Sequence, residues 1–192
     1  MILHLLLILL CIVLSAFFSG SEIAYSASQE LRLEHAAREK KGAYGLALKV
    51  KRRFEQALIS ILVGNNLVNI GASSLATVIA VGLMGEKGAW VATAIMTVLI
   101  ITFGEIAPKI IASAQPERSS AVAAVPLRLW MIVTWPLVWA LEKLLHVLAR
   151  LWARGQDSGP AVTEDDLETI IETVEDEGVV DEDTADLLQS AL

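Results

Sequence analysis

The residues of this chain best suited to chemistry are a carboxylate and a backbone carbonyl group at the end of an apolar run. Glu105 follows residues 89–103, which contain no charged side chain, and hydrocarbon cannot solvate a carboxylate there. Pro108 has no N–H, so the Gly104 carbonyl four residues earlier loses its helical hydrogen-bond partner. Together the two groups offer hard oxygen ligands to a small hard cation. This pattern predicts ion transport.

Two further groups of polar side chains interrupt apolar runs and supply possible oxygen ligands. Ser19 and Ser21 follow the first apolar run, whereas Asn65, Asn66 and Asn69 lie within the second. We expect each group at a depth similar to that of the carboxylate. Serine and asparagine in membrane helices also serve simply to join neighbouring helices. We favour one shared site, because three amides so close together exceed what helix packing requires.

A structural role is also open for the central carboxylate. Glu105 and Lys109 are four residues apart, so their side chains could form an ion pair along one helix face. If the polar groups instead share an ion, neutral oxygens with one carboxylate suit Mg²⁺, Ca²⁺ or Na⁺. Zinc or copper is not expected, because the three histidines are scattered and the single cysteine, Cys11, lies in an apolar run.

The overall composition is that of a membrane protein with a soluble extension. The chain has 192 residues, 55% of them hydrophobic, and its mean hydropathy is +0.58. Thirteen of the 22 acidic residues fall in residues 156–192, which contain no lysine or arginine. We therefore predict a transmembrane region at residues 1–155 and an acidic cytosolic helical region at residues 156–192. The acidic excess argues against binding to nucleic acid.

Three apolar runs approach or exceed the length needed to cross a bilayer: residues 1–18, 57–84 and 88–114. A cleaved signal peptide is the alternative for the first run, but its start carries no lysine or arginine. Residues 29–56 hold eight basic residues against four glutamates, and positive connections stay in the cytoplasm. We predict a multi-pass plasma-membrane protein with its N-terminus outside and its C-terminus in the cytoplasm.

Two further segments are expected on the cytoplasmic side. The basic connection alternates apolar and charged residues, which predicts two short amphipathic helices separated near Gly42. Residues 121–151 contain Pro126, Pro136 and three tryptophans, and basic residues flank both ends. Because tryptophan gathers at the headgroup boundary, we favour a kinked juxtamembrane helix. A fourth span remains the alternative.

The acidic region has the pattern of two helices. Thr163 and Asp166 approximate a capping box before an apolar helical stripe, and a second helix is expected near Asp181. The chain then ends without a folded domain to close this pair, so we expect it to be part of a longer protein. The predicted fold is an all-α membrane protein with three transmembrane helices, short cytoplasmic-side helices, the kinked juxtamembrane helix and an acidic helical tail.

Three motifs carry a resemblance to a known family. Phe-Phe-Ser-Gly-Ser-Glu begins at Phe17, Gly-Asn-Asn-Leu-Val-Asn at Gly64, and Phe-Gly-Glu-Ile-Ala-Pro-Lys at Phe103. In this order and spacing, the chain resembles the transmembrane domain of the CNNM/CorC family of magnesium transporters. The resemblance covers residues 1 to about 155, and the acidic helices resemble the linker that precedes the family's CBS pair.

The resemblance implies a homodimer of three-span protomers in the lipid bilayer that exports Mg²⁺, coupled to Na⁺. It implies ion ligands at Ser19, Asn65, Glu105 and the Gly104 carbonyl. The neighbouring Ser21, Asn66 and Asn69 are secondary candidates, and Ser21 and Asn66 complete the predicted metal-site residues. Because this chain lacks the CBS pair, nucleotide binding is not expected in it.

A function of another class is also open. The chain could be a membrane anchor and dimerisation module that displays its acidic helices to a cytosolic partner. Such an anchor would have no use for Glu105 and Asn65, whereas a transporter would fail without them. An enzyme is not expected, because neither a serine–histidine pair nor a His-Glu-x-x-His signature of an intramembrane hydrolase is present.

Overall fold

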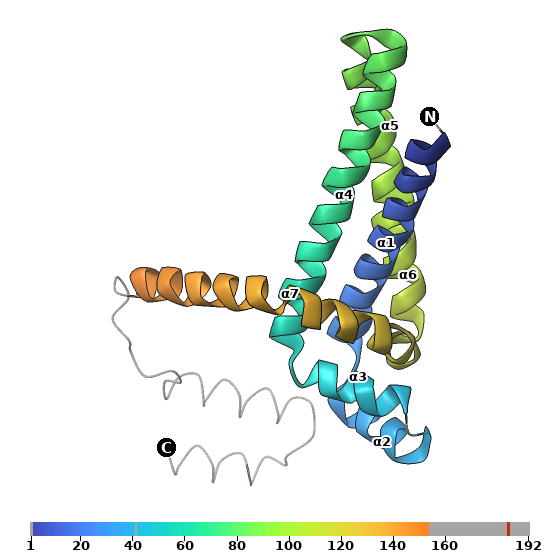
Figure 1. The fold of residues 1–192 in the computed structure, drawn as a ribbon. Helices are drawn as coiled ribbons and strands as arrows, with labels where there is room; N and C mark the ends of the chain where they lie inside the picture. Colours follow the sequence, from blue (N-terminus) through green and yellow to red (C-terminus); the bar gives the residue numbers. More distant parts are fainter. Residues whose placement is uncertain (1, 41, 154–183, 185–192) are drawn as a thin grey trace. The chain divides into compact units, whose positions relative to one another are not determined.

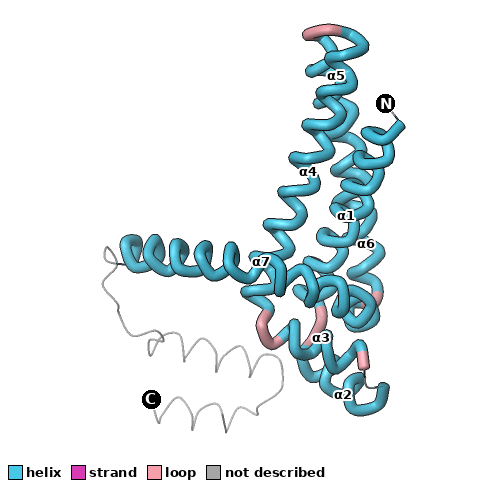
Figure 2. Tube along the Cα trace, in the orientation of Figure 1, coloured by secondary structure: helices cyan, strands magenta, loops and turns pink. Residues whose placement is uncertain are grey.

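The described part of the chain is helical throughout apart from its short connections. The computed structural model describes residues 2–40, 42–153 and 184, and no strand occurs among them. Figures 1 and 2 show the arrangement. The chain divides into a compact unit, Met1–Glu142, and a second unit, Lys143–Leu192. The two helices expected in the acidic region lie outside the described residues, and the boundary at residue 155 stays a prediction.

Three long helical segments run side by side and form the bundle (Figure 1). They are α1 (Ile2–Ala27), α4 (Phe54–Met84), and a third segment made of α5 (Lys87–Leu99), the π-helical η1 (Ile100–Ile106) and α6 (Ala107–Ala114). These correspond to the three predicted apolar runs. The first helix is longer than predicted, because it continues through the polar residues after Phe18 to Ala27.

The hairpin between α4 and α5 is tight because of two glycines. Gly85 ends α4 with a φ of 67°, a left-handed conformation that favours glycine. A Cβ atom on Gly88 would collide with the backbone of Ala80, so only glycine lets the two helices approach this closely. The turn therefore folds the third segment directly back along α4.

The basic connection forms two short helices at the end of the bundle where α1 finishes. They are α2 (Glu30–Lys40) and α3 (Ala43–Lys51), with Gly42 between them at a φ of 67°, as predicted. The Lys51 ammonium group donates to the Tyr25 carbonyl oxygen at 2.6 Å. Because helix ends leave carbonyl groups without partners, this bond satisfies one of those of α1. It fixes α3 against the end of α1.

Helix α7 (Pro116–Ala153) begins earlier than predicted and contains both internal prolines. Up to Glu142 it runs across the bundle rather than along it (Figure 1). The Tyr25 hydroxyl donates to the Ser120 carbonyl oxygen at 2.9 Å, and the Trp130 indole N–H donates to the Ser60 carbonyl oxygen at 2.8 Å. These bonds tie α7 to the last turns of α1 and the first turns of α4.

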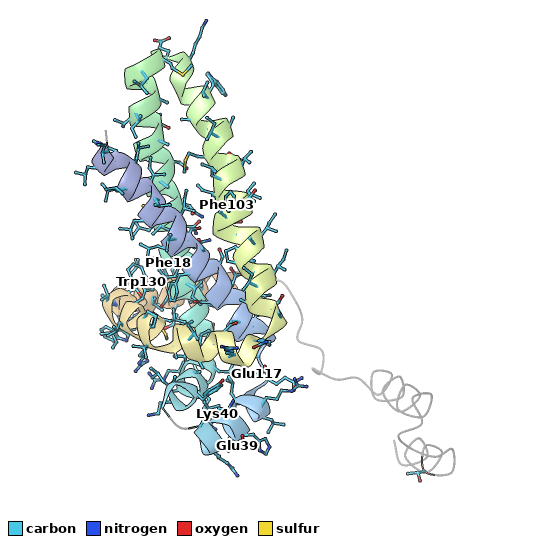
Figure 3. All side chains as sticks on the ribbon, turned by 90° about the vertical axis from the view of Figure 1, so that its right-hand side faces the viewer. Phe18, Glu39, Lys40, Phe103, Glu117 and Trp130 are labelled. Atoms are coloured by element: carbon cyan, nitrogen blue, oxygen red, sulfur yellow. The ribbon has the colours of Figure 1, made fainter. Side chains whose placement is uncertain are left out.

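Four helical segments among the described residues are long and apolar enough to cross a membrane. They are the three predicted runs and α7, where the sequence favoured a juxtamembrane helix over a fourth span. What distinguishes α7, as far as Glu142, is its course across the other three segments, which run side by side (Figures 1 and 3).

The outer faces of the bundle carry many large apolar side chains. Phe103 on the third segment (Figure 3), for example, is 57% exposed. Soluble monomers rarely expose continuous apolar surface of this kind, whereas lipid chains would cover it. The exposed apolar faces therefore agree with a membrane location.

The packing of α1 against α4 predicts a sharp difference between two glycines of α4. A Cβ atom on Gly64 would overlap the Phe18 ring, whereas a Cβ atom on Gly71 would meet nothing within 4 Å. We expect Gly64→Ala to destabilise the protein by about 1–3 kcal/mol through overpacking. Gly71→Ala should be neutral or stabilising by up to about 1 kcal/mol, since alanine favours helix.

Thermal unfolding of both variants in the same detergent checks this prediction. Equal melting temperatures for Gly64→Ala and Gly71→Ala would contradict the close contact of Gly64 with Phe18.

Candidate metal site

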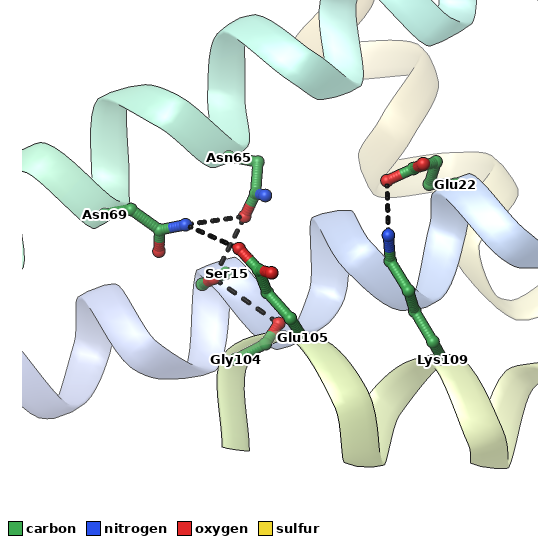
Figure 4. A network of polar contacts seen from close by, with 7 residues as sticks. All are labelled: Ser15, Glu22, Asn65, Asn69, Gly104, Glu105 and Lys109. Carbon is green, nitrogen blue, oxygen red and sulfur yellow. Dashed lines mark hydrogen bonds and ion pairs between the residues drawn. The ribbon is translucent and has the colours of Figure 1, made fainter. Parts of the chain in front are cut away.

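Four polar side chains and one backbone carbonyl group from three helical segments meet inside the bundle (Figure 4). We call these residues the Glu105 cluster: Ser15, Asn65, Asn69, Gly104 and Glu105. The Ser15 hydroxyl donates to Asn65 Oδ1 at 2.9 Å and lies 3.4 Å from the Gly104 carbonyl oxygen. The Asn69 amide nitrogen lies 3.4 Å from both Asn65 Oδ1 and Glu105 Oε1. One network therefore connects α1, α4 and η1.

The backbone of η1 brings its oxygen atoms into this network. Its π-helical turns end at Ile106, two residues before Pro108, and π-helical segments often occur at functional sites. Gly104 is buried, and a Cβ atom on it would lie only 2.8 Å from the Ser15 hydroxyl oxygen. Glycine at this position therefore allows α1 to approach the backbone of η1.

The oxygen atoms of the cluster are of the kind that bind hard cations. The carboxylate of Glu105 is accompanied by the Asn65 amide oxygen, the Gly104 carbonyl oxygen and the Ser15 hydroxyl. Mg²⁺ and Ca²⁺ prefer such oxygen ligands. Among the described residues, no three histidine, cysteine or acidic side chains lie close enough together to hold a metal ion. A cation at the cluster would therefore be bound by one carboxylate and several neutral oxygen atoms.

The structure brings together some of the predicted site residues and separates others. Asn65, Gly104 and Glu105 lie in one network, and Asn69, a secondary candidate, joins them. Asn66 is on the exposed face of α4. That residue contacts none of the cluster through a hydrogen bond in the described part of the chain.

The two predicted serines have different surroundings. Ser21 donates its hydroxyl to the Phe17 carbonyl oxygen of its own helix at 2.7 Å. The Ser19 hydroxyl is fully buried and has no hydrogen-bond partner among the described residues. A buried hydroxyl without a partner is costly. Ser19 therefore stays a candidate ligand, although it is outside the network.

Ser15 takes the place in the network that was predicted for Ser19. The prediction assumed a first span that ends at Phe18, whereas α1 runs on to Ala27. A longer helix shifts the depth of every residue in it, and four residues correspond to about 6 Å. The available sequence signal was the spacing of Ser15 and Ser19, which places both on one helix face.

Lys109 does not pair with Glu105, so the proposed intrahelical ion pair is wrong. The Lys109 ammonium group instead lies 3.2 Å from Glu22 Oε2 on α1 (Figure 4). Both side chains are partly exposed. The Glu105 carboxylate is instead hydrogen-bonded to the neutral Asn69 amide.

Comparison with known proteins identifies the family. Residues 6–184 match the CNNM family, described as "Cyclin M transmembrane N-terminal domain". The chain belongs to the CNNM family. The match covers most of its length and includes the three motifs that suggested this membership. The family assignment and the apolar helices together identify a membrane protein.

Relatives occur in bacteria, plants and animals. The chain is 34% identical over 161 residues to the UPF0053 inner membrane protein YfjD of Escherichia coli, a match that covers 82% of this chain and 37% of that protein. It is 30% identical over 180 residues to the DUF21 domain-containing protein At1g55930, chloroplastic, of Arabidopsis thaliana, covering 93% of this chain and 27% of that protein. The metal transporter cnnm-1 of Caenorhabditis elegans is 32% identical over 145 residues, covering 73% and 17%.

These matches cover about a third or less of each relative's length. Membership in a family that includes a metal transporter agrees with the prediction that the chain is not an enzyme.

The network predicts unequal roles for two buried serines of α1. Ser15→Ala removes a hydroxyl that contacts both α4 and η1, whereas Ser21→Ala removes one that contacts only its own helix. We expect Ser15→Ala to lower stability by about 0.6 kcal/mol, the average for hydrogen bonds between membrane helices, and by at most about 1.7 kcal/mol. Ser21→Ala should change it less.

Thermal unfolding of the two variants in detergent without divalent cations measures this difference. A larger loss of stability in Ser21→Ala than in Ser15→Ala would contradict the assignment of Ser15 to the network.

Proposed function

We propose that this chain is the membrane domain of a transporter that binds Mg²⁺ at the Glu105 cluster and exports it, coupled to Na⁺. The observation that carries this proposal is the carboxylate of Glu105 among neutral oxygens from three helical segments inside an apolar bundle. A charged group in this position is expensive and usually functional. The relative named metal transporter cnnm-1 supports cation transport.

The chemistry of the cluster suits Mg²⁺ that keeps part of its water shell. Mg²⁺ binds one or two carboxylates and keeps several of its waters, which suits a site with a single carboxylate. The amide and carbonyl dipoles complete the shell without adding charge. A site with a net charge of only −1 also releases its ion more readily than a cage of several carboxylates, and transport requires release.

The proposal includes three spans and a homodimer in the bilayer. The three segments that run side by side are taken as the spans, and α7 as a juxtamembrane helix at the cytoplasmic surface. Helices α2 and α3 with their basic residues then lie on the cytoplasmic side, in keeping with the distribution of positive charge. The N-terminus and the turn at Gly85 lie at the opposite end of the bundle (Figure 1).

Neutralising the central carboxylate tests the binding site. Glu105→Gln keeps the shape of the side chain and removes its charge, so we expect Mg²⁺ to bind at least about tenfold more weakly, or about 1.4 kcal/mol. Glu55→Gln is the matched control, because Glu55 is exposed in the first turn of α4. Calorimetric titration of the purified proteins with Mg²⁺ measures both.

The melting temperature of each variant without divalent ions separates loss of binding from loss of folding. Equal Mg²⁺ affinities for wild type and a folded Glu105→Gln variant would refute the site. In proteoliposomes, Mg²⁺ flux that depends on a Na⁺ gradient and is lost in Glu105→Gln would support coupled transport. If Mg²⁺ bound but no flux were measured, the transport proposal would be refuted, and the chain would be interpreted as a membrane anchor that binds an ion.

The proposed topology makes a separate prediction. In a Cys11→Ala background, Lys87→Cys and Asp157→Cys place single thiols beyond α4 and beyond α7. If α7 lies along the cytoplasmic surface, a membrane-impermeant thiol reagent outside intact cells should label the first and spare the second. Labelling of both from outside would mean that α7 crosses the membrane.

A further inference from the structure

Where α7 crosses the start of α4, the two helices enclose an open cavity of about 320 Å³. Its lining comes from Arg53, Gln56 and Ser60 at the start of α4 and from residues of α7 between Arg128 and Glu142. All of these residues belong to the same compact unit. The Trp130 bond to the Ser60 carbonyl oxygen holds the two walls together. The cavity is separate from the Glu105 cluster.

The cavity is lined by two guanidinium groups, those of Arg53 and Arg128. Among the described residues, neither the Arg53 nor the Arg128 side chain has an ion pair or a hydrogen bond, in contrast to Arg52, which binds Glu30 at 2.8 Å. The single carboxylate of the lining, Glu142, is engaged in an interaction of its own. The two arginines are therefore available to an anion.

The remaining walls have the character of a membrane interface. Trp135 and Trp139 are 65% and 49% exposed and border the cavity together with Met131, Ile132 and Val138. Tryptophan side chains gather at the headgroup level of bilayers. The basic residues of α2 and α3 are at the same end of the bundle (Figure 1). The apolar side chains, the two tryptophans and the two arginines thus line the same cavity.

We propose that this cavity binds the phosphate-bearing headgroup of an anionic phospholipid from the cytoplasmic leaflet. Arg53 and Arg128 contact the phosphate, because guanidinium groups form paired, charge-assisted hydrogen bonds with phosphate oxygens. The apolar residues of α7 contact the start of the acyl chains. A bound lipid would hold α7 against α4 at the bilayer surface, where anionic lipids attract basic segments. This proposal depends on the membrane placement proposed above and not on transport.

Lipid retention by the full chain tests the site. We expect the purified protein to bind phosphatidylglycerol at least about tenfold more tightly than phosphatidylcholine with the same acyl chains, as measured by native mass spectrometry. Both lipids carry a phosphate, but the choline ammonium group of phosphatidylcholine would be repelled by the two guanidinium groups, whereas phosphatidylglycerol has no such cation. The Arg53→Gln/Arg128→Gln variant should lose this preference. Arg53 is exposed, so Arg53→Gln alone should fold normally and weaken it.

The control is Arg32→Gln/Arg118→Gln, which removes the same charge from residues outside the cavity. It should keep the preference for phosphatidylglycerol. Equal binding of the two lipids, or an equal loss in the control, would overturn the proposal, because only general charge attraction would remain. Complete displacement of phosphatidylglycerol by millimolar inorganic phosphate would also overturn it, since the cavity would then bind soluble anions.

Retained lipid preference in a Glu105→Gln variant that no longer binds Mg²⁺ would show that the two sites are independent. The failure of one proposal can therefore be told from the failure of the other.

Discussion

A carboxylate among apolar helices must find polar partners within the protein, because hydrocarbon offers none. The arrangement around Glu105 follows from this requirement. Asn69 provides an amide donor to the carboxylate, and Asn65 connects that amide to the Ser15 hydroxyl. Ser15 in turn reaches the Gly104 carbonyl oxygen. The hydrogen bonds that surround the Glu105 carboxylate thus join all three helical segments, and the same groups carry oxygen atoms of the kind that bind hard cations.

Such short side chains can bridge helices only where the helices lie unusually close. Lipid chains are as apolar as leucine, so hydrophobic burial contributes little to helix association, and close packing by small residues replaces it. Gly64 accommodates the Phe18 ring, Gly88 accommodates the backbone at Ala80, and Gly104 accommodates Ser15. Each glycine fixes a distance between two segments, and the last of them is itself part of the cluster.

The sequence predicted the parts of this arrangement that depend on local chemistry. Glu105 and Asn65 stood out because charged and amide groups are costly within apolar runs, and Gly42 predicted the break between α2 and α3. Ser15 was missed although it shares a helix face with Ser19, because its depth depends on where α1 ends, and tertiary contacts of Tyr25 with α3 and α7 hold that end. The course of α7 depends on the same contacts, so its pattern alone left two interpretations open.

The ion pair of Lys109 with Glu22 keeps this lysine away from the carboxylate of the cluster. Lys109 lies one helical turn after Glu105, about 6 Å along the axis, and a bare ammonium group there would compete with any cation for the carboxylate. Glu22, about 10 Å along α1 from Ser15, binds this ammonium group at 3.2 Å and draws it toward α1. On the proposed function, a cation approaching the cluster from the end where α1 finishes would meet this neutralised pair first. The order of groups along the bundle, with the ion pair nearer that end and the single carboxylate farther from it, would then leave the Glu105 cluster as the next group to attract the cation.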